Sequence, residues 1–145
     1  MNQKRIRLIL IMLFVLVILG TVGEFLFNSK NENIEVNNTS ELSWNSLSQE
    51  QVVNAMEKDD VILVDLREVE LYQNNHIPGS INIPFDDIRN RYTELDANKE
   101  IIFICHSGRM GADSSQFLID KGYKKVGNLN GGMNLWSGPL ESGQQ

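Results

Sequence analysis

Two short apolar runs constrain the fold of this chain more than any other feature of its sequence. Residues 61–64 and 101–104 consist only of valine, isoleucine, leucine and phenylalanine. Runs of this length and composition are typical of central strands in a parallel sheet, where both faces are buried. Segments with helical patterns separate and follow them. We therefore predict an α/β fold with a mainly parallel central sheet and helices on both faces.

Caps and breakers predict where the remaining elements lie. Ser48 and Gln51 form a capping-box pattern, which predicts a helix that runs to about residue 58. Gly122 would end the longest helix. We expect further helices at 68–74, 85–92, 111–121 and after Gly131, with short strands at 81–83 and 124–126.

The N-terminal segment differs from the rest of the chain. A basic start with Lys4, Arg5 and Arg7 precedes the uncharged apolar run 8–23. This pattern predicts an export signal, which we expect to be retained as a single-pass membrane anchor, with secretion after cleavage as the alternative. The positive-inside rule would then place the folded domain outside the cytoplasmic membrane. The expected organisation is a signal-anchor at 1–27, a flexible linker at 28–42, a domain at 43–140 and a tail at 141–145.

Charge and cysteine content exclude several kinds of site. The net charge is −6 and no basic face is evident, so we expect no nucleic-acid partner. Cys105 is the only cysteine, which excludes an internal disulfide. No paired Cys and His spacing suggests a zinc site.

Cys105 directly follows the second apolar run and precedes a loop of small and polar residues. A strand, a tight loop and a helix start would aim backbone N–H groups and the positive end of a helix dipole at its sulfur. A thiol in that position should ionise more readily than an unconstrained one, which predicts a nucleophile. A buried structural cysteine is the alternative.

The residues after Cys105 have candidate roles. Gly108 and Gly111 would let the chain curl around a sulfur or an oxyanion. Arg109 could bind an anionic donor or hold the shape of the loop. Ser107 could donate its hydroxyl to the thiolate or cap the following helix.

For the histidines and the charged residues near the strand ends, we expect roles in structure more than in catalysis. We expect His106 to lie at the rim, pointing away from the preceding cysteine, and His76 to be hydrogen-bonded within a turn. Asp65 and Arg67 follow the first apolar run and should support the site from its edge, either by pairing with each other or by binding loop backbone. Trp136 is expected in the core or a pocket wall.

Three motifs together resemble the rhodanese family. Residues 65–68, Tyr72 and residues 76–84 resemble its first signature, and residues 105–109 resemble its active-site loop. The glycine pair at 131–132 with Trp136 resembles its C-terminal element. The motifs occur in the family's order across 43–140.

The resemblance implies a three-layer rhodanese-like fold and sulfurtransferase chemistry. Cys105 would take a sulfane sulfur from a donor such as thiosulfate or a persulfide, and a thiol or cyanide would then remove it. The resemblance implies no metal and no organic cofactor. Three positions depart from the family pattern. Leu71 stands where an acidic residue often precedes the tyrosine, although Glu70 is adjacent. Asn75 replaces a glycine and is expected to keep a left-handed backbone, and Met110 lowers the positive charge at the loop.

Three other functions compete with sulfurtransferase activity. Phosphatases and arsenate reductases with a similar loop place an arginine six positions after the cysteine, where this chain has Gly111. A non-catalytic binding module would lack Cys105. A persulfide carrier that serves a protein partner would use the same residues as the enzyme, and both interpretations stay open here.

Overall fold

The computed structural model describes residues 43–143, so the predicted anchor at 1–27 and linker at 28–42 lie outside the described residues. Within 43–143, no helix combines the length and apolar character needed to cross a bilayer. We expected the domain to end at residue 140. Its backbone contacts extend further, because His76 and Glu141 exchange two hydrogen bonds and Gly143 N–H donates to Gln73.

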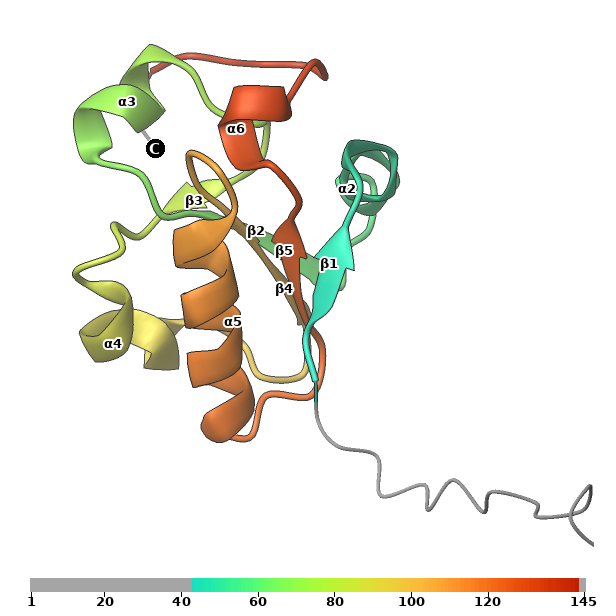
Figure 1. Cartoon of the computed structure of the whole chain (residues 1–145), viewed down its shortest axis with the longest axis vertical. Coiled ribbons are helices and arrows are strands. Elements are labelled where there is room, and N and C mark those ends of the chain that lie inside the picture. Colours follow the sequence, from blue (N-terminus) through green and yellow to red (C-terminus); the bar gives the residue numbers. More distant parts are fainter. Residues whose placement is uncertain (1–42, 144–145) are drawn as a thin grey trace, which may run out of the picture. The chain divides into compact units, whose positions relative to one another are not determined.

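Five parallel strands form the sheet, in the spatial order β1-β5-β4-β2-β3 (Figure 1). This arrangement confirms the predicted α/β fold with a parallel central sheet. In that order, the strands are Asn45–Leu47, Val126–Leu129, Glu100–Ile104, Val61–Asp65 and Ile81–Asn82. Asp65 pairs with Ile104 in the register of the two central strands. The chain therefore leaves β2 and β4 at the same edge of the sheet, which brings residues 65–67 towards Cys105.

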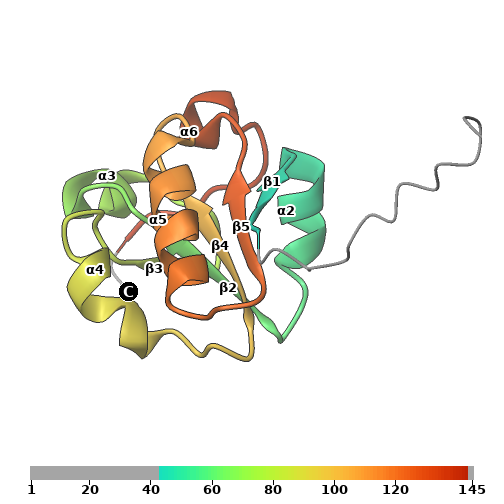
Figure 2. The same ribbon diagram turned by 60° about the horizontal axis from the view of Figure 1, so that its bottom comes forward.

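Helices cover both faces of the sheet, as Figures 1 and 2 show. Helix α2 (Gln49–Ala55) packs on one face, whereas α4 (Ile88–Arg91) and α5 (Arg109–Asp120) pack on the other. Side chains along β4 alternate between the two cores, since Ile101 and Phe103 join one and Ile102 and Ile104 join the other. The unbroken apolar run reflects this burial on both sides.

Two short helices lie at the edge of the sheet where the parallel strands end (Figure 1). Helix α3 (Val69–Asn74) follows β2, and helix α6 (Gly132–Leu135) follows β5. Both are therefore close to the chain segments that carry the candidate site residues.

Several predicted boundaries were wrong. Helix α2 ends at Ala55, and α4 begins at Ile88 because residues 84–87 form a turn closed by the Pro84 carbonyl. A 3₁₀ turn, η1 (Tyr92–Glu94), follows α4. Helix α5 begins at Arg109, two residues earlier than expected.

The strands β5 and β1 also differ from the prediction. β5 spans Val126–Leu129, whereas 124–126 had been expected, and Lys124 and Lys125 are exposed outside it. Strand β1 was not predicted, because Leu47 is its one apolar residue. Pairing with neighbouring strands overrides the weak strand preference of these segments.

Candidate active site

Cys105 lies one residue beyond β4 and is 1% exposed. Its sulfur accepts a hydrogen bond from the backbone N–H of Gly108, with 3.1 Å between Sγ and N. Gly108 is the N-cap of α5, so the sulfur lies at the positive end of a twelve-residue helix. Both effects stabilise negative charge on sulfur, and the structure thus places the predicted nucleophile where an anion is favoured.

Gly108 and Gly111 have different roles, although both were predicted to curl the loop. Gly108 has φ +91°, a left-handed conformation that glycine adopts without strain. Gly111 lies within α5 and has no positive φ. A Cβ atom at position 111 would lie 1.9 Å from Oδ1 of Asn128, so Gly111 permits the close approach of helix and strand. The prediction that Gly111 curls the loop was wrong.

Helix α6 binds the outer side of the cysteine loop. The backbone N–H of Met133 donates to the carbonyl of Cys105 at 2.8 Å, and that of Asn134 donates to the carbonyl of His106 at 2.9 Å. In a trans peptide the N–H points opposite to the carbonyl. Because α6 holds these carbonyls on its own side, the N–H groups of the same two peptides face away from α6. The loop is therefore ordered by its backbone.

The glycine pair before α6 makes this contact possible. A Cβ atom on Gly132 would lie 2.2 Å from the carbonyl oxygen of Cys105 and 2.7 Å from that of His106. Gly131 and Gly132 also have φ angles of +75° and +56°. The motif recognised in the sequence thus serves to bring α6 against the loop.

The other predicted loop residues lie on the first turn of α5 or just before it. Arg109 is the first residue of the helix and its side chain is exposed, whereas Met110 is partly buried against the core. Ser107 is exposed and does not cap α5, because Gly108 occupies the N-cap and no side chain caps it. The predicted alternative in which Ser107 caps the helix was therefore wrong.

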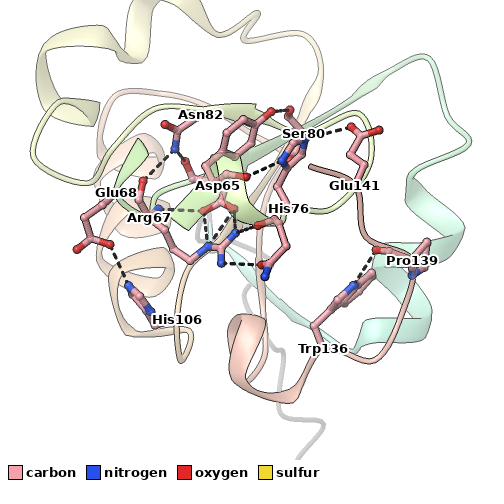
Figure 3. A network of polar contacts seen from close by, with 12 residues as sticks. Asp65, Arg67, Glu68, His76, Ser80, Asn82, His106, Trp136, Pro139 and Glu141 are labelled. Atoms are coloured by element: carbon pink, nitrogen blue, oxygen red, sulfur yellow. Dashed lines mark hydrogen bonds and ion pairs between the residues drawn. The ribbon is translucent and has the colours of Figure 1, made fainter. Parts of the chain in front are cut away.

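His106 lies at the rim of the site. Its Nε2 atom is 3.1 Å from Oε2 of Glu68, and both side chains are substantially exposed (Figure 3). A backbone hydrogen bond, and then the contact with His106, lower the pKa of Glu68 below its usual value. This pair joins the loop after β2 to the loop after β4. The pair was not predicted from the sequence, because Glu68 and His106 are far apart in the chain.

Asp65 and Arg67 form a buried ion pair at the end of β2 (Figure 3). Nη2 of Arg67 is 2.7 Å from Oδ2 of Asp65, and Nε is 3.0 Å from Oδ1. The guanidinium also donates to the backbone carbonyl of Asn75 at 2.6 Å. Among the hydrogen bonds of residues 43–143, none links either side chain to residues 105–111. The pair holds the segment around α3, so its support of the cysteine loop is indirect.

Asn75 does not adopt the predicted left-handed conformation. Its φ and ψ angles are −161° and 140°, an extended backbone. This orientation presents its carbonyl oxygen to Arg67. A second residue in the turn, His76, is 4% exposed, with Nδ1 2.7 Å from the carbonyl oxygen of Tyr72 and Nε2 3.1 Å from Oε1 of Glu141. His76 thus links the turn to the C-terminal segment.

Two further residues complete the surroundings. Trp136 is partly buried on the core that contains α2, and its Nε1 donates to the carbonyl of Pro139 at 3.0 Å (Figure 3). It lines a groove with Leu135 and the start of α2. Asn128 on β5 donates from Nδ2 to the carbonyl of Gly108 at 2.8 Å. Asn128 was not predicted from the sequence, although an amide inside a buried strand is a detectable signal. Across 43–143, no three His, Cys, Asp or Glu side chains group as a metal site requires.

Comparisons with known proteins agree with this geometry. Residues 48–139 match the rhodanese-like domain. The chain is 34% identical over 120 residues to the putative sulfur carrier protein YrkF of Bacillus subtilis, covering 82% of this chain and 65% of that protein. It therefore spans less than two thirds of the length of YrkF. It is 27% identical over 95 residues to the thiosulfate sulfurtransferase GlpE of Pseudoalteromonas translucida, covering 66% of this chain and 90% of that enzyme.

Solved structures show the same relationship. A rhodanese-like domain protein from Staphylococcus aureus superposes with a TM-score of 0.61 at 27% identity, over 68% of this chain and 97% of that one. The sheet order, the cysteine loop at the start of α5 and the matched residues lead to one conclusion. The chain belongs to the rhodanese-like family of sulfurtransferases and sulfur carriers.

Proposed function

We propose that this protein transfers a sulfane sulfur through a persulfide on Cys105. The observation that carries the proposal is the sulfur of Cys105 held at the N-terminus of α5, with the N–H of Gly108 directed at it. The named activities of the relatives support the same chemistry. Residues 106–111 would form the donor site, in which Arg109 is exposed at the first turn of α5 and available to an anionic donor.

The reaction proceeds in two displacements. The Cys105 thiolate attacks the outer sulfur of thiosulfate, the bond between the two sulfur atoms of the donor breaks, and sulfite leaves with the bonding electron pair. A thiolate or cyanide then attacks the outer sulfur of the persulfide, and the Cys105 thiolate leaves. The bound persulfide anion would be stabilised by the same N–H group and helix terminus as the thiolate.

Mass spectrometry of the full-length chain tests this proposal. After incubation with thiosulfate, we expect the wild type to gain the mass of one sulfur atom and the Cys105→Ala variant to gain none. Subsequent addition of cyanide should restore the original mass. Unchanged mass with thiosulfate and with persulfide donors would contradict the proposal. Turnover of para-nitrophenyl phosphate that is lost in Cys105→Ser would favour the phosphatase alternative.

A persulfide carrier is the second candidate, favoured by the similarity to the putative carrier YrkF. Cys105 is 1% exposed, so little of its surface is accessible to an acceptor. If the domain is a carrier, loading by a donor should be fast, whereas release to cyanide or small thiols should be slow enough to isolate the loaded protein. Rapid release to small acceptors would instead favour the enzyme.

We also propose that residues 1–27 anchor the domain outside the cytoplasmic membrane. The basic residues followed by the uncharged run 8–23 support this location. If the domain lies outside the membrane, protease added to cells with an accessible outer face of the cytoplasmic membrane should cleave it from its anchor. Recovery of the full-length chain in the soluble cell fraction would contradict the proposal.

A further inference from the structure

Asn128 is a buried amide in a strand whose other residues are apolar or glycine. All of β5 is buried, and Asn128 itself is 4% exposed. Its Oδ1 has no hydrogen-bond partner among the described residues. A buried acceptor without a partner weakens a fold, so the stability of β5 alone does not account for this residue.

The amide nitrogen of Asn128 contacts the cysteine loop. Nδ2 donates to the carbonyl of Gly108 at 2.8 Å, while the N–H of Gly108 donates to the sulfur of Cys105 at 3.1 Å. Because a carbonyl oxygen only accepts hydrogen bonds, the nitrogen of the amide must face it and the oxygen must face away. Gly108 therefore connects the amide of Asn128 to the sulfur of Cys105.

Gly111 allows the side chain of Asn128 to reach the loop. A Cβ atom at position 111 would lie 1.9 Å from Oδ1 and 2.7 Å from Cγ of Asn128. Any other residue at position 111 would displace the amide. Gly111 in α5 thus leaves the space in which Asn128 of β5 reaches the cysteine loop.

Gly108 needs a restraint of this kind. It has a left-handed φ of +91° and, lacking a side chain, little resistance to rotation of its peptides. The carbonyls of Cys105 and His106 are bound by α6, whereas that of Gly108 accepts from Ala112 within α5 and from Asn128. The amide of Asn128 thus ties the carbonyl of Gly108 to β5.

We propose that Asn128 is a positioning residue, which orients Gly108 so that its N–H points at the sulfur of Cys105. Its effect on sulfur transfer rests on the proposed function, but its effect on Gly108 does not. The residue touches neither donor nor acceptor and acts through the loop.

An Asn128→Leu variant of the full-length chain tests the proposal. Leucine removes the donor and also removes the acceptor without a partner. We expect persulfide formation to slow about three- to tenfold, the scale of one hydrogen bond. The amide proton of Gly108 should shift in the NMR spectrum and exchange faster with solvent, while the melting temperature stays the same or rises. Ser115→Ala is the control, because Ser115 donates to Gly127 across the same helix–strand contact but not to the loop.

An Asn128→Asp variant adds a signature that a purely structural role would lack. A protonated carboxyl can donate to the carbonyl of Gly108, whereas a carboxylate cannot. The rate relative to wild type should therefore rise as the pH falls. If the Gly108 signal in Asn128→Leu matches the wild type, the proposal is overturned. If the wild type forms no persulfide, the sulfurtransferase proposal fails, and the Gly108 signal still decides the role of Asn128.

Discussion

The two loops that meet at the edge of the sheet are held by opposite means. The segment after β2 is held by side chains, with Asp65 and Arg67 paired at 2.7 Å and almost fully buried. The loop after β4 is held by its backbone, whose carbonyls accept from α6 and from Asn128. A buried charge pair supports the fold, whereas a backbone-held loop leaves N–H groups free for an anion. The difference separates residues that maintain the domain from residues that shape its chemistry.

The largest effect should follow from breaking the side-chain-held segment. Arg67→Ala leaves the carboxylate of Asp65 buried without its partner, which should lower the free energy of unfolding by about 3–5 kcal/mol. Urea denaturation monitored by circular dichroism measures this change. Persulfide formation per folded molecule should stay close to wild type. A loss of activity without a loss of stability would show that the pair acts in the chemistry instead.

A replacement in α6, the helix that binds the loop after β4, should lower activity more than stability. In Gly132→Ala the new Cβ atom would lie 2.2 Å from the carbonyl oxygen of Cys105, so the loop must move. Misplacement of a reacting group by about 1 Å can slow a reaction by about a hundredfold. We expect persulfide formation to fall by roughly ten- to a hundredfold, measured by mass spectrometry over time.

Gly122→Ala is the matched control for this replacement. Gly122 has φ +92°, but no atom lies within 4 Å of the position its Cβ atom would take. Both variants introduce backbone strain of about 1–3 kcal/mol, and only Gly132→Ala introduces the collision with the loop. Equal activity of the two variants would contradict the role assigned to α6.

The smallest effect should come from the exposed pair that joins the two loops. The pKa of Glu68 lies below its usual value of 4.5, so its charged form is favoured in the folded state. The resulting stabilisation is present above pH 4.5 and is lost as the pH falls through the lowered pKa. Glu68→Gln should therefore melt slightly below the wild type at neutral pH, with the difference disappearing in acid and at high salt. Thermal unfolding across pH and salt checks this.

The central fold could be predicted from local patterns, whereas its periphery could not. The runs at 61–64 and 101–104 are buried on both faces, and for this reason every residue in them is apolar. β1 has one apolar residue, Leu47, and pairs with β5 through backbone hydrogen bonds that depend little on residue type, proline excepted. The prediction of a left-handed backbone at Asn75 was wrong. The extended backbone lets its carbonyl accept a hydrogen bond from Arg67, and this contact cannot be read from the local sequence.

By itself, the sequence determined the family, the parallel sheet and the position of Cys105 at a strand end, because these depend on residue type and spacing along the chain. Only the tertiary structure decided what surrounds the sulfur. It showed that Gly111 makes room for Asn128 and that Gly132 brings α6 against the loop. The physical reason is that close approach between segments depends on the space a missing Cβ leaves. That space depends on which segments pack together in three dimensions.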